Sequence, residues 1–275
     1  MSTFTFNHEP GSTRVEVQID LKRLSNIAQT GVRRAAAFLG LGLQAFPNGP
    51  PKSVTVGGAF SYRFLPDPLP EELQQQVQDE FTAWLIGNAL RELDQHLGIF
   101  LDDVWDVLRF TTGEKVEMEW SDTPFDKKFR GGTNVSSKAA QVAKALDCTL
   151  EFEALKSLSL ARNALSHSVG TVRDRDANEP GGLRLTWLAF QAGIRMDGIV
   201  HDLDGLAEGF RVTSPGGGEV VAEIKRKEAF FAVGESVRLS PHQLSEICFF
   251  YSHCSSVIIE AVSKRAGQLQ LSKES

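Results

Sequence analysis

Four polar side chains lie close together near the middle of the chain, in a stretch otherwise rich in leucine and alanine. They are Arg162, Asn163, Ser166 and His167, within residues 160–170. An arginine offers a planar fork of donors that fits the oxygens of a phosphate group. A histidine gives or takes a proton near neutral pH. Residues of these types could together carry out phosphodiester chemistry.

The spacing of these side chains decides whether they can meet. The segment is typical of the end of an amphipathic helix that stops near Gly170. On such a helix Asn163 and His167 share a face, as do Arg162 and Ser166, and the two faces lie about 100° apart. All four head groups could therefore converge on one corner. The alternative is structural: cations at a helix C-terminus that interact favourably with the helix dipole, next to a polar end turn.

The apolar side of this helix leaves two of the polar groups accessible. Its stripe consists of Phe152, Leu155, Leu158 and Leu165. Arg162 and His167 lie off that stripe, so we expect both head groups to reach solvent. This placement disfavours the interpretation of His167 as a histidine satisfied inside the core.

The spacing Arg-Asn-x-x-x-His at Arg162, Asn163 and His167 resembles the signature of the HEPN superfamily. That pattern is an arginine, four to six residues and a histidine, with a polar residue often just after the arginine. Long helical patterns before the motif and near the C-terminus fit the same family. The resemblance covers roughly residues 70–170 and 240–265. Some toxin members carry a tyrosine two residues after the histidine, where this chain has Val169, so regulation through that tyrosine is not expected.

The resemblance implies an all-α bundle of four to five helices and, as in many members, a metal-independent endoribonuclease. His167 would act as general acid or base, Arg162 would stabilise charge in the transition state, Asn163 would orient the histidine or the phosphate, and Ser166 would support them. Attack by the 2′-hydroxyl would leave a cyclic phosphate and a 5′-hydroxyl, with no metal or other cofactor. Two copies of the motif would meet across a two-fold homodimer to form one composite site.

The implied partners are RNA, a second copy of the chain and, in toxin–antitoxin or anti-phage defence, a cognate antitoxin or regulatory protein. The alternative, from another class, is a catalytically silent HEPN-like module that binds RNA or a protein. The net charge of −6 favours this alternative. An Arg162 that is buried against Glu92, with no cleft, would also favour it.

Composition places the chain among ordinary globular proteins, with 275 residues, 41% hydrophobic and 23% charged. Three cysteines are too few and too odd in number for a disulfide framework, which predicts a reducing, cytoplasmic setting. We see no signal peptide and no apolar run of membrane-spanning length, so no membrane partner is expected. An acidic chain needs a local basic patch to contact RNA. The candidates for such a patch are Lys127, Lys128, Arg130, Arg173 and Arg175.

Helical periodicity predicts one very long helix, or two broken near Gly98, over residues 71–110. Asn88, Glu92 and His96 fall four apart on its more polar face. Glu92 and His96 are therefore candidates to support the site, while the alternative is a solvated face. Further helices are predicted at 136–148, 151–168 and 240–265, the last with an N-cap serine, a proline at its first position and a glutamine three residues after the cap.

Strand patterns occur in the remaining segments of the chain. Residues 1–68 form a mixed α/β segment, with strand patterns at 14–21 and 53–64 around a helix at 22–41. By the resemblance, residues 69–275 are expected to form a HEPN-like helical domain, interrupted by a β-rich insertion at about 183–239. Two strands of that insertion, 219–224 and 229–233, are expected on either side of the basic residues 225–227. His201, Asp202 and Asp204 lack the three or four convergent ligands of a metal site. The predicted fold is mainly α, a HEPN-like bundle with a β-containing N-terminal segment and a β insertion.

Overall fold

A computed structural model of the chain describes residues 2–5, 16–45, 53–56, 60–63, 66, 68, 70–111, 129, 134–168, 170–196, 198–202 and 217–271. Five α-helices make up most of this described part: α1 (Leu21–Ala45), α2 (Glu71–Thr111), α4 (Val135–Leu146), α5 (Phe152–His167) and α6 (Pro241–Leu271). The prediction of a mainly α fold is thereby confirmed. Among the described helices, none combines the length and apolar character that a membrane crossing requires.

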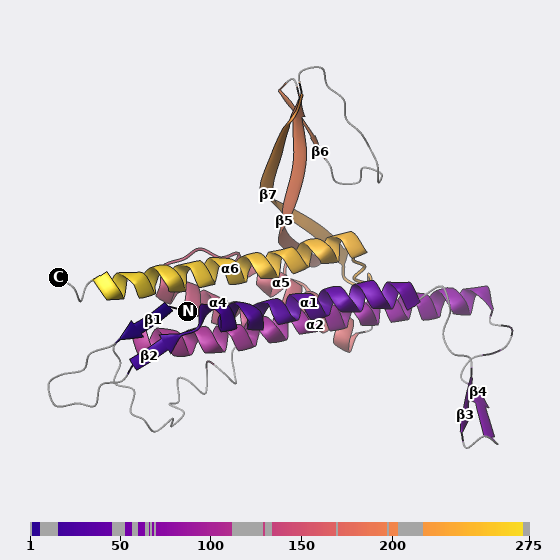
Figure 1. The fold of residues 1–275 in the computed structure, drawn as a ribbon. Coiled ribbons are helices and arrows are strands. Elements are labelled where there is room, and N and C mark those ends of the chain that lie inside the picture. Colours follow the sequence, from indigo (N-terminus) through magenta and orange to yellow (C-terminus); the bar gives the residue numbers. More distant parts are fainter. Residues whose placement is uncertain are drawn as a thin grey trace.

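The helices pack side by side into one elongated body, in which α1, α2 and α6 run along the length of the molecule (Figure 1). The shorter helices α4 and α5 pack against α2 and against each other. One continuous hydrophobic core joins all five helices. Burial of each large apolar side chain in such a core contributes roughly 1.5–3 kcal/mol, which is what holds the bundle together.

Helix α2 continues unbroken through Gly98, so the sequence pattern describes one long helix and not two. Apolar residues at helical spacing form its buried face, as at Leu93, Phe100 and Val104. A Cβ atom added at Gly98 would lie 3.6 Å from Val135, an ordinary contact distance. Gly98 therefore marks the place where the start of α4 passes over α2, and it neither breaks nor bends the longer helix.

Helix α1 covers the face of α2 that carries Glu92 and His96. A Cβ atom added at Gly31 would lie 2.7 Å from the Cβ of His96 and 2.9 Å from the carbonyl oxygen of Glu92. Only a glycine allows so close an approach. Glu92 is accordingly buried, and this face is not the solvated one that the sequence offered as an alternative. The long helix of the predicted N-terminal segment thus shares its core with the helical body.

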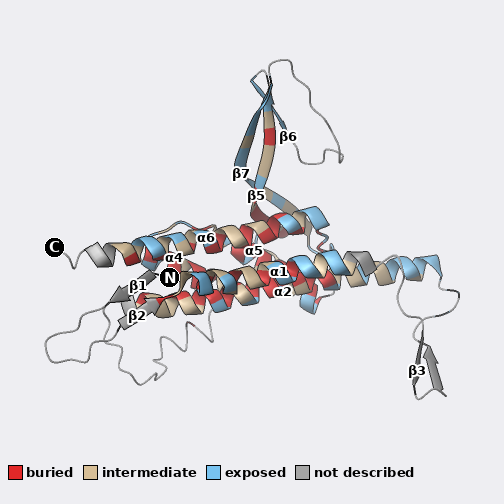
Figure 2. Cartoon of the chain, viewed as in Figure 1, coloured by how far each residue is buried: buried red, intermediate tan, exposed pale blue. Residues whose placement is uncertain are grey.

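The insertion after α5 forms a three-stranded antiparallel sheet that projects from the body as an arm (Figure 1). Its strands are β5 (Gly182–Met196), β6 (Ile199–Asp202) and β7 (Glu219–Ala232), in the order β6-β5-β7. Figure 2 shows that buried residues gather where the arm meets the helices, while its outer part is mostly exposed. Leu183, Leu185 and Trp187 at the base are buried in the core.

The expectation of two short strands around the basic residues 225–227 is wrong, because β7 runs through them without a break. Lys225, Arg226 and Lys227 pair with positions 189, 188 and 187 of β5. Lys225 and Arg226 are exposed, so their charged head groups remain hydrated while their backbone completes the ladder. The charges therefore mark a solvated stretch of strand, and not a turn.

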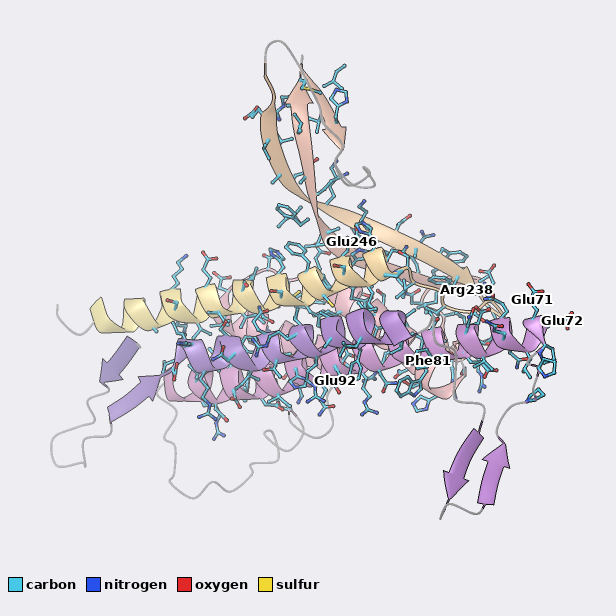
Figure 3. All side chains as sticks on the ribbon, turned by 45° about the vertical axis from the view of Figure 1, so that its right-hand side comes forward. Glu71, Glu72, Phe81, Glu92, Arg238 and Glu246 are labelled. Atoms are coloured by element: carbon cyan, nitrogen blue, oxygen red, sulfur yellow. The ribbon has the colours of Figure 1, made fainter. Side chains whose placement is uncertain are left out.

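The base of the arm is fixed to α6 by a buried carboxylate, Glu246 (Figure 3). The indole Nε1 of Trp187 donates a hydrogen bond of 2.9 Å to Glu246, and His242 Nε2 lies 3.3 Å from the other carboxylate oxygen. The start of α6 is confirmed: the amide of Gln243 donates to Ser240 Oγ, and the amide of Ser240 donates to the Gln243 side chain. This reciprocal cap fixes where the helix begins and so where Glu246 lies.

Two small hairpins complete the described residues. β1 (Ser2–Thr5) pairs with β2 (Glu16–Ile19), and β2 lies within the strand predicted at 14–21. β3 (Ser53–Val56) pairs with β4 (Phe60–Arg63), and both lie within the strand pattern at 53–64. Both pairs are antiparallel. Their sequences alternate β-branched or aromatic residues with polar ones, the pattern of half-buried strands.

Candidate functional site

The motif helix α5 ends where the sequence predicts. Its last helical residue is His167, and Gly170 adopts a left-handed backbone with φ of +84°. The amides of Ser168 and Gly170 both donate to the carbonyl oxygen of Ala164, which closes the last turn. Glycine takes such a φ at little cost, so this residue determines that the helix ends directly after the motif.

Arg162 is held by a buried carboxylate of α2, Asp94, which the sequence analysis did not single out. Arg162 Nη1 lies 3.4 Å from Asp94 Oδ2, and that oxygen also accepts a hydrogen bond of 3.0 Å from Ser159 Oγ. The Tyr251 hydroxyl of α6 donates to Asp94 Oδ1 at 2.5 Å. Only 2% of the Asp94 side chain is exposed, against 31% for Arg162. Residues from α2, α5 and α6 thus fix one end of the guanidinium.

Burial raises the pKa of Asp94 above its ordinary value, and the hydrogen bond from Tyr251, the charge of Arg162 and the hydrogen bond from Ser159 oppose that rise only in part. Burial also raises the pKa of the Tyr251 phenol well above its usual value, so this hydroxyl stays protonated and acts as the donor. The ion pair between Asp94 and Arg162 is therefore expected to weaken as the pH falls through the raised pKa of Asp94.

A pocket of about 350 Å³ opens beside this network, between α5 and the first turn of α4. Three cationic side chains line it: Lys138 of α4, and Lys156 and Arg162 of α5. Its other polar lining residues are Asp94, Asn134, Ser136, Ser159 and Asn163. Asp94 is the one acidic residue among them, so the lining carries more positive than negative charge.

The two lysines of the pocket are held differently. Lys138 is buried, and its Nζ lies 2.7 and 3.0 Å from the two carboxylate oxygens of Asp102 and 5.5 Å from the ring centre of Phe129. Lys156 is more than half exposed and its Nζ is 3.7 Å from an exposed carboxylate of Glu153. Surface pairs of this kind contribute about 0–1 kcal/mol, so Lys156 can turn toward a ligand at little cost.

Both asparagines of the pocket use their side-chain oxygens within the protein. Asn163 Oδ1 accepts a hydrogen bond of 2.8 Å from Arg162 Nη2. Asn134 Oδ1 caps α4 by accepting from the amide of Ser137 and from Ser136 Oγ. An amide whose oxygen is occupied has its NH₂ group left to offer. The pocket therefore presents chiefly donors and cations, the groups that bind an anion.

His167 and Ser166 lie outside this pocket, and both are exposed. Five residues along an α-helix turn the direction of a side chain by about 140° and advance it by about 7.5 Å. Arg162 and Asn163 both line the pocket, while His167, one turn beyond Asn163 at the end of α5, does not. In one copy of the chain this pocket therefore contains two of the four motif side chains.

Glu92 and His96, the predicted supporting residues, face α1, whereas Asp94 faces α5 and α6. Arg34 Nε of α1 lies 2.7 Å from Glu92 Oε2. His96 Nδ1 lies 2.9 Å from the carbonyl oxygen of Glu92, the geometry of a hydrogen bond within the helix. Neither residue lines the Arg162 pocket. Their contacts tie α1 to α2.

The predicted basic patches contribute little to this pocket. Lys127, Lys128 and Arg130 lie outside the described residues. Arg173 and Arg175 are exposed around a short 3₁₀ turn, Asp174–Asp176, after the motif. Arg175 Nε lies 3.9 Å from Asp176 Oδ1, and Asp176 also accepts a hydrogen bond from the amide of Arg173. Asp176 therefore neutralises part of the positive charge of this turn.

Within the described ranges, no three histidine, cysteine, aspartate or glutamate side chains cluster closely enough to hold a metal ion. No family model, curated protein or solved structure matches this chain. A functional assignment therefore depends on the motif and on the geometry around it.

Proposed function

We propose that the chain is a HEPN-type endoribonuclease whose active site is completed by a second copy of itself. One observation carries the proposal: Arg162 is fixed by Asp94 at the wall of a cationic pocket, while His167 is exposed on the last turn of the same helix. A positioned cation can stabilise the charge that develops during metal-independent cleavage of RNA, and an accessible imidazole can transfer the proton.

Arg162 supplies the fixed positive charge. Nη1 faces Asp94 and Nη2 donates to Asn163, so two buried or half-buried partners determine where the guanidinium points. A guanidinium carries five N–H donors, and those not used in these contacts are left for phosphate oxygens. Because the group is already oriented, it can stabilise the negative charge that develops on phosphorus-bound oxygens without reorganising first.

His167 supplies the proton transfer. One His167 takes the proton from the 2′-hydroxyl as that oxygen bonds to phosphorus. The bond from phosphorus to the 5′-oxygen breaks, and the His167 of the second copy protonates the leaving oxygen. The products are a 2′,3′-cyclic phosphate and a 5′-hydroxyl. The exposure of His167, and its place outside the Arg162 pocket of its own copy, are the reasons to assign the site to a two-fold dimer.

A silent RNA-binding module is the second candidate, and one observation favours it. The charge of Arg162 is already paired with that of Asp94, and His167 does not line the pocket that contains Arg162. In that case the pocket would bind RNA without cleaving it.

Cleavage of RNA by the purified protein in excess chelator tests the proposal. His167→Ala should lower the rate by roughly 10²–10⁴-fold, the usual contribution of a positioned acid–base group. His201→Ala, at an exposed histidine of β6, is the matched control and should leave the rate unchanged. DNA of the same sequence should be inert because it lacks the attacking hydroxyl. Cleavage of DNA, or full RNase activity in His167→Ala, would contradict the proposal.

A further inference from the structure

The pocket beside Arg162 extends well beyond the motif. Arg162 and Asn163 form one side of it, and the first turn of α4 with Lys138 and Lys156 forms the rest. Its volume of about 350 Å³ is at the lower end of small-molecule sites. It can therefore hold more than the single phosphate group that Arg162 would contact during cleavage.

We infer that this pocket is a subsite for a second RNA phosphate, the one adjacent to the phosphate that is cleaved. Lys156 and the NH₂ group of Asn134 are its principal donors. The inference rests on the proposed ribonuclease function, since Arg162 and Asn163 belong to both the motif and the pocket. The bound group is a phosphodiester of single-stranded RNA, whose successive phosphates could be held by the two sides of the pocket.

The charges around the pocket support an anionic ligand. Its lining residues include three cations and one carboxylate. Lys138 is neutralised by Asp102, and Asp94 takes up part of the charge of Arg162. Lys156 is different, because its contact with Glu153 is a loose surface pair. It is the cation that a ligand can recruit at the lowest cost.

The hydrogen bonds around the pocket also favour an anionic ligand. Asn134 and Asn163 lie on different helix ends, yet each turns its oxygen toward a protein donor. The group that each amide has left is a donor. A neutral or cationic ligand would find few acceptors in this pocket other than Asp94, which is buried and already accepts from Tyr251 and Ser159.

Binding of 2′-O-methyl oligonucleotides, which lack the attacking hydroxyl, measures the subsite without cleavage. The wild-type protein should bind a trinucleotide, with two phosphates, more tightly than a dinucleotide with one. Lys156→Ala should weaken trinucleotide binding about fivefold to tenfold, close to the dinucleotide level. It should also reduce the slope of log affinity against log salt by about 0.7, the value for one phosphate contact on a single strand. Lys144→Ala, an exposed lysine of α4 outside the pocket, should change neither quantity.

A second variant separates folding from binding. Asn134→Asp keeps an acceptor that caps α4, because aspartate is as good an N-cap as asparagine. It replaces the NH₂ donor with a negative charge, so trinucleotide binding should fall at least as far as in Lys156→Ala, with unchanged thermal stability.

Three outcomes would overturn the inference: equal affinity for the two oligonucleotides, equal behaviour of Lys156→Ala and Lys144→Ala, or Lys156-dependent binding of inorganic phosphate alone. The last would identify a site for free phosphate. Lys156-dependent trinucleotide binding by a protein that never cleaves RNA would instead contradict the proposed nuclease and leave the phosphate subsite in place.

Discussion

Two carboxylates lie two residues apart on α2, and the structure gives them opposite roles. Glu92 faces α1, where its partner Arg34 is more than half exposed and His96 lies one turn away. Asp94 faces α5 and α6, where Tyr251, Ser159 and Arg162 surround it. Two residues turn a helix by about 200°, which is enough to send neighbouring side chains into different environments.

The difference shows what makes a carboxylate part of a site. Glu92 attaches α2 to α1 through the long, partly solvated side chain of Arg34. On the other side of α2, the buried carboxylate of Asp94 has three partners. It determines the direction of the Arg162 guanidinium at the wall of the pocket. Removing a partner from Asp94 should therefore affect function, while removing one from Glu92 should affect only packing.

The largest effect is expected for Arg162→Ala. Cleavage should fall by roughly 10²–10⁴-fold, because fixed positive charge disappears from the transition state. The loss also leaves Asp94 buried without its cation, so we expect the free energy of unfolding to fall by about 1–3 kcal/mol; complete burial of both partners would give 3–5 kcal/mol. Rates on RNA and denaturant unfolding measure the two effects.

The pH dependence of that stability loss follows from the raised pKa of Asp94. Removing Arg162 raises this pKa further, because the cation favours the ionised carboxylate. The difference in stability between wild type and Arg162→Ala should thus be largest above the raised pKa. It should shrink as the pH falls through it, because a protonated Asp94 no longer needs a cation. A difference that grows toward acid pH would contradict this account.

Asp94→Asn should have the second largest effect. The amide keeps an oxygen for the hydroxyl of Tyr251, so the fold should persist. The ion pair with Arg162 is lost, and the guanidinium is then held by Asn163 alone. We expect cleavage to fall about tenfold to a hundredfold, through the turnover number more than the Michaelis constant, because transition-state charge is stabilised less well. An unchanged turnover number would show that Asp94 does not position Arg162.

Glu92→Gln is the matched control on the other side of α2 and should have the smallest effect. The glutamine retains the shape of the side chain, and the exposed Arg34 can return to water. We expect a change of less than about 1 kcal/mol in the free energy of unfolding and no change in cleavage. A loss of cleavage equal to that of Asp94→Asn would remove the distinction between the two carboxylates.

Much of the fold could be predicted from local patterns. The sequence directly reveals the helical periodicity of α2, the glycine that ends α5 and the serine–glutamine cap of α6. Each of these features acts within one or two helical turns. The continuous strand β7 was missed because a basic run inside a solvated strand has the composition of a turn.

The site was only half predictable, and the reason is physical. Arg162 and Asn163 could be found from their types and spacing. Asp94 and Tyr251 could not, since they meet across 157 positions of sequence through the packing of α2 against α6. Glu92 was the more attractive candidate from sequence because its spacing to His96 is visible, whereas the cover provided by α1 depends on the close approach at Gly31.

The central claim is that the active site needs two copies of the chain, and mixed dimers test it most directly. Wild-type and His167→Ala chains are co-expressed with different tags and purified through both tags. Each mixed dimer retains only one of the two His167 side chains that the shared site uses, so cleavage of RNA should be at least about tenfold slower than with the wild-type dimer. A mixed dimer with about half of the wild-type rate, which two independent sites would give, or a protein that cleaves RNA as a monomer, would contradict the account.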